Sequence, residues 1–207
     1  MRAVSIFVVL LSMAAGLLAA GLALTDRAEA QSCSDCPVTS LPSGPPNPPW
    51  GPGPATITTP NTDSIATSIA GITDTCGRVD PRYRIDCLRR AYIEAARDIP
   101  DTGDYRPVRQ ALLDAAAKLD GIVTANLDPA LEPLRPREFG KPLAKRLPPV
   151  RAVAGDRLTE ASRAAEAVIA ETGLLILRSG DRPPRRTSHY QTIAAAVDTN
   201  LILLRSG

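Results

Sequence analysis

Apolar residues recur every three or four positions along most of the chain after residue 60, and this spacing predicts helices. The clearest case is residues 105–126, where the apolar seam alternates between steps of four and three. Its members are Val108, Leu112, Ala115, Leu119, Ile122 and Asn126. A seam this narrow is typical of helices in a bundle or coiled coil. Asp128-Pro129 is expected to close the helix.

Two shorter helices are predicted ahead of this one. The first has Ile65, Ile69, Ile72 and Cys76 on one face. The second opens at Asp80-Pro81, ends before Pro100, and has Ile85, Leu88, Tyr92, Ala95 and Ile99 on its apolar face. Its arginines lie off that face and are expected to be solvated; they are Arg84, Arg89, Arg90 and Arg97.

Two long helices are predicted on the C-terminal side, over about 150–179 and 186–205. Their ends are similar, because residues 171–180 reappear with an offset of 27 at 198–207. Each copy holds four consecutive apolar residues, 174–177 and 201–204, which is more than one helix stripe needs. We expect these ends either to be buried nearly all round or to form a self-association surface that includes Leu201 and Leu204.

The connection over 127–149 is rich in proline and in basic residues. It holds six prolines together with Arg135, Arg137, Lys141, Lys145 and Arg146. A connection this long is uncommon inside a compact domain. It can wrap the bundle as a solvated loop, or it can act as a functional loop that meets an acidic partner, such as an anionic cell-wall polymer or lipid head groups.

Residues 1–30 have the pattern of a secretory signal peptide. A basic start at Arg2 precedes an uncharged, apolar run over 3–24, and Ala28-Glu29-Ala30 provides a cleavage site before Gln31. Cleavage would leave a periplasmic or secreted protein. The apolar run is also long enough to span a bilayer, so an uncleaved membrane anchor is the alternative, and a lipid-modified Cys33 is a third.

Residues 31–60 are predicted to form a proline-rich arm. Nine prolines fall within 37–60, a density that excludes helix and favours polyproline II or disorder. The arm is expected to be a stiff spacer. A docking peptide anchored by Trp50 is the alternative.

Four cysteines, at positions 33, 36, 76 and 87, would be exposed to an oxidising compartment and are expected to pair. Three pairings are possible, and nearness in sequence favours Cys33–Cys36 and Cys76–Cys87. A Cys76–Cys87 bridge would staple the first two helices into a hairpin. Because a disulfide needs its Cα atoms within about 7 Å, we expect the first helix to end near Thr73 and Cys76 to lie in the connection.

Candidate chemistry is sparse. The net charge of +2 is too balanced to indicate nucleic acid as a partner. His189 is the only histidine, and the sequence shows no cluster of metal-ligating residues around it. Its neighbours Ser188 and Tyr190 do not form a nucleophile–base pair with it, because adjacent residues on a helix point away from each other. His189 is therefore expected to have a surface or capping role. The glycines form no phosphate loop. We predict no catalytic residue, metal site or cofactor.

The sequence thus predicts an all-α, disulfide-stapled bundle of about five helices over 61–207. Three helices (61–126) precede the basic connection (127–149), and two long helices (150–207) follow it. The favoured function is that of an exported, non-catalytic cell-envelope protein that binds an envelope protein, a wall polymer or another copy of itself. One alternative is a periplasmic carrier with a ligand cavity between the two helical groups. The other is a redox or enzymatic protein that uses the Cys33/Cys36 pair.

Overall fold

The computed structural model describes residues 56–181 and 184–206, apart from the side chains of Glu138 and Phe139. These residues belong to one compact unit, Pro48–Gly207. The predicted signal segment, Cys33, Cys36 and Trp50 lie outside the described residues, so the predictions made for them stay predictions. Within the described ranges the chain is helical, and its only β-type pairings are two isolated bridges.

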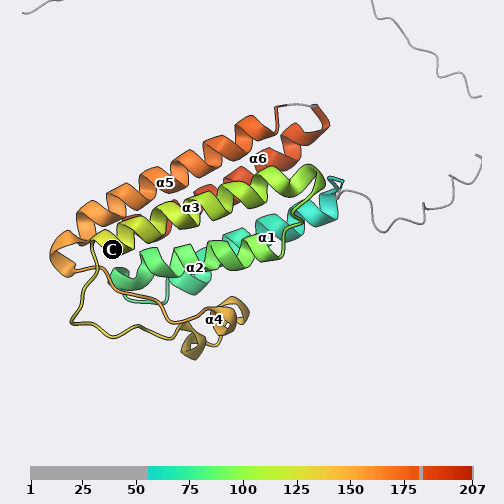
Figure 1. The fold of residues 1–207 in the computed structure, drawn as a ribbon. Helices are drawn as coiled ribbons and strands as arrows, with labels where there is room; N and C mark the ends of the chain where they lie inside the picture. The colour runs from blue at the N-terminus through green and yellow to red at the C-terminus, as the bar shows by residue number, and fades with distance from the viewer. Residues whose placement is uncertain (1–55, 182–183, 207) are drawn as a thin grey trace, which may run out of the picture. The chain divides into compact units, whose positions relative to one another are not determined.

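Five longer helices form the bundle: α1 (Thr59–Cys76), α2 (Arg84–Arg97), α3 (Arg106–Ala125), α5 (Leu158–Ser179) and α6 (Thr187–Asp198). They are arranged as a closed ring in which each helix packs against two others (Figure 1). The pairs are α1–α2, α2–α3, α3–α5, α5–α6 and α6–α1. Two helices of five residues, α4 (Pro142–Arg146) and α7 (Leu201–Arg205), pack on the outside and at one end.

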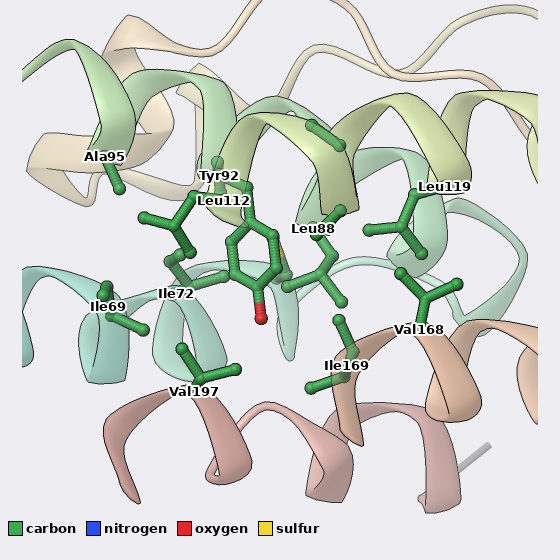
Figure 2. Close-up of a cluster of buried hydrophobic side chains, with 14 of the residues drawn as sticks. Ile69, Ile72, Leu88, Tyr92, Ala95, Leu112, Leu119, Val168, Ile169 and Val197 are labelled. Carbon is green, nitrogen blue, oxygen red and sulfur yellow. The ribbon is translucent and has the colours of Figure 1, made fainter. Parts of the chain in front are cut away.

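A single core fills the ring, with contributions from both predicted helical groups. Tyr92 of α2 lies in the middle of this cluster, among aliphatic residues of α1, α3, α5 and α6 (Figure 2). Small residues such as Ala96, Ala116 and Ala165 are also buried in it, and they let neighbouring helices approach closely. The predicted all-α bundle is therefore confirmed.

The Cys76–Cys87 disulfide is present, with its Cα atoms 5.7 Å apart. The prediction that the first helix ends near Thr73 is wrong, because α1 continues to Cys76. The expected geometric conflict does not arise, since α2 begins only at Arg84, after a 3₁₀ turn over Pro81–Tyr83. Cys87 therefore lies in the first turn of α2, level with the end of α1.

The helix predicted from about residue 150 begins only at Leu158. The backbone groups of Val150 and Val153 form hydrogen bonds with distant segments instead of with a helix of their own. Val150 and Leu134 exchange N–H···O bonds of 2.8 and 2.9 Å, and the Val153 amide donates to the Arg82 carbonyl at 2.9 Å. Val150 and Val153 are fully buried in this extended arrangement, so burial of the two valines is achieved without a helix.

The last predicted helix, 186–205, is broken into α6 and α7 at Thr199 and Asn200. Asn200 is fully buried; its side chain accepts a hydrogen bond from the Thr73 hydroxyl at 3.0 Å and donates to the Tyr92 hydroxyl at 3.4 Å. Its amide bonds to Val197, three residues back, which is 3₁₀ rather than α spacing. The break turns α7 inward and buries Leu203 and Leu204.

Candidate interaction surfaces

Few large aliphatic side chains of the described bundle are exposed. In the described part of the chain they are Leu127, Leu174, Leu175, Leu177 and Ile202, so four of the five belong to α5 and α7. Leu174 is 52% exposed and Leu177 follows three residues later, so the two share one helix face. We call Leu174 and Leu177 the α5 leucine pair.

The expectation that both apolar helix ends are buried nearly all round is wrong. Ile176 is fully buried, but the α5 leucine pair and Ile202 are exposed, because a helix in a single ring turns only one side to the core. Leu204 is buried and Leu201 is partly buried against the core. Of the two proposed surface residues, therefore, Leu204 contributes to the fold itself. The exposed leucines lie in the other copy of the repeated segment.

The basic connection wraps the outside of the bundle rather than leaving it. Ala144 and Leu147 are buried, while Leu131, Leu134 and Leu143 pack partly buried against the core. Two of its five basic residues form ion pairs with the bundle: Lys141 Nζ lies 2.7 Å from Asp74 Oδ2, and Arg146 Nη1 lies 3.0 Å from Asp98 Oδ2. Arg135, Arg137 and Lys145 are exposed.

The segment creates a groove where α4 lies beside α1. The groove has a volume of about 400 Å³. Small residues of α1 line one side and Pro142 and Leu143 of α4 line the other. Lys141 and Arg146, the two cations that tie α4 to the bundle, are also among its lining residues.

A second hollow of about 360 Å³ lies between the start of α5 and α7. It lies between the two helical groups, which is where the carrier hypothesis places its ligand cavity. Its lining includes four charged residues, Arg84, Arg163, Arg205 and Glu166. Arg84 Nη1 donates to the Leu203 carbonyl and to Ser206 Oγ, both at 3.0 Å. Arg205 pairs with Glu166 at 3.2 Å. These charges hold the end of the chain against α2 and α5.

A buried ionic cluster links α2, α3 and the segment that precedes α5. Asp86 is fully buried; it accepts hydrogen bonds from Arg89 Nε at 2.5 Å and from the Arg151 amide at 2.8 Å. Asp120 bridges Arg89 and Arg151 at 3.2 and 2.7 Å. The prediction that Arg89 is solvated is wrong, because the segment around Arg151 folds back over this side of α2. Periodicity along α2 alone carries no sign of that neighbour.

Burial and hydrogen bonding act on the Asp86 carboxyl in opposite directions. Burial by itself raises the pKa of Asp86, but the hydrogen bonds from Arg89 and Arg151 outweigh it, and the pKa lies below its ordinary value. The carboxyl is therefore ionised at neutral pH and fully engaged. It joins three parts of the fold and has no access to a substrate.

His189 connects α6 to α1 through a short hydrogen-bonded chain. Its Nδ1 lies 2.9 Å from the Thr62 hydroxyl, which lies 2.9 Å from the Tyr105 hydroxyl. Tyr105 in turn donates to the Thr58 carbonyl at 3.0 Å. Thr62 and Tyr105 are buried, so the chain of bonds fixes the start of α1. His189 thus has an inter-helix role that its sequence neighbours gave no sign of.

Among residues 56–181 and 184–206, no group of three or more His, Cys, Asp or Glu side chains is placed to hold a metal ion. Cys76 and Cys87 are both fully buried in their disulfide. The same part of the chain contains no helix that is both long and apolar enough to cross a bilayer.

Comparison with known proteins finds no family model that matches the sequence, no similar curated protein and no similar solved structure.

Proposed function

We propose that this is an exported, non-catalytic cell-envelope protein that acts as a helical binding or self-associating module. The observation that carries the proposal is the exposed α5 leucine pair, Leu174 and Leu177. The protein would hold a partner macromolecule, or a second copy of itself, against this face of α5.

Export is supported by two independent features. The first thirty residues have the composition of a cleavable signal, with Ala28-Glu29-Ala30 before the expected cut. The Cys76–Cys87 disulfide is the kind of bond that persists in oxidising compartments and is rare in the cytosol. Together they favour a periplasmic or secreted protein, presented on its proline-rich arm.

The binding role is supported by where the apolar surface lies. Single exposed leucines are ordinary, but neighbouring ones on one helix face form a patch that a partner can remove from water. Because Leu174 and Leu177 are only 52% and 36% exposed, covering each of them would contribute about 1 kcal/mol to binding. Tyrosine is a common residue of binding surfaces in proteins. Here Tyr92, Tyr105 and Tyr190 are fully buried in the fold, so they do not contribute to a surface.

A variant with aspartate at both positions of the α5 leucine pair, Leu174→Asp with Leu177→Asp, tests the proposal. Fluorescently labelled protein is sedimented alone over a concentration series and in an envelope extract of the cells that produce it. We expect the wild type to sediment faster than a monomer in at least one condition, and the double variant to sediment as a monomer in both.

Leu127→Asp is the matched control, because Leu127 is 43% exposed but lies beyond the end of α3. It should behave as the wild type. The proposal fails if the wild type sediments as a monomer in both conditions, or if the double variant keeps the faster-sedimenting species.

A further inference from the structure

Beyond this proposed function, the groove between α1 and α4 has the features of a small-molecule site. We propose that it binds an amphipathic anion: an unbranched apolar chain that ends in a carboxylate or a comparable anionic group. The apolar chain would lie between α1 and α4, and the anionic group would meet Lys141 and Arg146.

The groove exists because the face of α1 beneath α4 carries small side chains. Thr67, Ser68, Gly71 and Thr75 line it from α1, and Ala95 lines it from α2. A Cβ atom added at Gly71 would meet no atom within 4 Å outside its own stretch of helix. The space above Gly71 is therefore open, although α4 lies beside it.

The wall opposite α1 is apolar and is held firmly in place. Pro142 and Leu143 provide it, and Leu143 packs against the main core while the next residue, Ala144, is fully buried. A volume of about 400 Å³ falls in the range of known small-molecule sites. The described uncharged side chains of the lining are small or aliphatic, and a flexible aliphatic chain fits between walls of this kind.

Charge selects the sign of the ligand. Among the described side chains, the charged residues of the lining are Lys141, Arg146 and Asp74, which together carry one net positive charge. Arg146 uses Nη1 to reach Asp98 and makes no other hydrogen bond to the part of the chain that the structure describes. A guanidinium has five N–H donors, so Arg146 can also meet an anionic oxygen.

The ion pairs that Lys141 and Arg146 already form do not prevent an anionic ligand from taking the place of their aspartate partners. Asp74 and Asp98 have side chains that are 68% and 54% exposed, so each can return to water when a ligand takes its cation. Exposed pairs of this kind contribute little to stability. An anionic ligand would therefore replace Asp74 or Asp98 at the groove while α4 stays in place through Ala144 and Leu147.

Three eight-carbon probes test the proposal by isothermal titration calorimetry on the purified full-length protein: octanoate, octanol and octyltrimethylammonium. We expect saturable binding of octanoate, binding of octanol that is roughly fivefold weaker, and no saturable binding of the cation. Lys141→Gln with Arg146→Gln should bring the affinity for octanoate down to that for octanol.

Gly71→Leu places a side chain in the groove, and Gly121→Leu is its matched control. Gly121 is an exposed helix glycine of α3 whose added Cβ would also meet nothing within 4 Å, and it lines a separate hollow between α3 and α5. Gly71→Leu should weaken octanoate binding by about tenfold or more, whereas Gly121→Leu should leave it unchanged. Circular dichroism of both variants confirms that they fold.

The proposal is overturned if octanoate does not bind saturably, or if all three probes bind alike. It is also overturned if folded Gly71→Leu binds as the wild type, or if Gly121→Leu is the variant that loses binding. None of these outcomes bears on the α5 leucine pair, so the two proposals fail separately.

Discussion

At the scale of single residues, the buried carboxylate of Asp86 ties α2 to the segment that precedes α5. Its carboxylate is surrounded by Arg89 of its own helix and by the amide and guanidinium of Arg151. A buried carboxylate with partners of this kind contributes less than its contacts suggest, because ionised groups are costly to bury. Removing it, however, leaves the guanidiniums of Arg89 and Arg151 to share the half-exposed Asp120 as their remaining carboxylate partner.

We expect Asp86→Asn to lower the free energy of unfolding by about 3 kcal/mol at neutral pH, measured by urea denaturation. The loss comes mainly from Arg89, whose side chain is only 8% exposed and would keep its charge without a full partner. Asp63→Asn, at an exposed position of α1, should change stability by less than about 0.5 kcal/mol.

The difference between wild type and Asp86→Asn should depend on pH in one direction. The pKa of Asp86 in the folded protein lies below its unfolded value of 3.8, so the folded state binds this proton less readily. The stabilisation is present above that value and is lost as pH falls through the lower, folded-state pKa. The gap between the two proteins should narrow in acid, and a gap that stays constant down to pH ~2 contradicts this account.

At the scale of elements, the α1–α2 hairpin depends on its disulfide. We expect Cys76→Ala with Cys87→Ala to lower the free energy of unfolding by about 3 kcal/mol, because the bridge restricts the unfolded chain over a sequence separation of 11 residues. Denaturant unfolding measures it. Both sulfurs are fully buried, so the native protein should also resist mild reductant.

The reference for this variant is reduced wild-type protein. It is prepared by unfolding the wild type, reducing it and refolding it under reducing conditions. The two should have the same stability. If the double alanine variant is as stable as the oxidised wild type, the hairpin does not depend on the bridge.

Local periodicity predicts a helix well where the burial of its own apolar face determines that it is helical. The apolar face of α2 is buried as its spacing indicates, and the α3 seam is buried from Val108 to Leu119. In the last turn of α3 the prediction is wrong, because Val123 is buried while Ile122 is only partly buried. The start of α5 and the break after α6 were missed because distant partners decide them. Val150 pairs with Leu134, and Asn200 bonds to Thr73 and Tyr92, contacts that no window of local sequence contains.

The candidate surfaces follow the same division. The excess of apolar residues over 174–177 is a sequence signal for a surface, but only the packing of α5 shows that Ile176 is buried while Leu174, Leu175 and Leu177 are exposed. No pattern in the sequence indicates the groove, because the groove forms only when α4 folds back on Gly71, about seventy residues earlier in the chain. A small residue on a helix becomes informative only once its neighbour is known.

At the scale of the whole molecule, one core joins the helices on both sides of the basic connection. The ring α1–α2–α3–α5–α6 is closed, so a partner has to bind on the outside of the described bundle. The α5 leucine pair lies on that outer surface, and its exposed side chains are not used by the fold itself.

The most direct test of the central claim is photo-crosslinking in living cells, with a photoreactive amino acid placed at Leu174. Ala117, exposed on α3, carries the same amino acid in the control. If α5 is the binding face, position 174 gives one dominant adduct, either a second copy of the chain or a single envelope component, and position 117 does not. If position 174 gives no adduct, or the same adducts as position 117, the α5 leucine pair is not a binding surface.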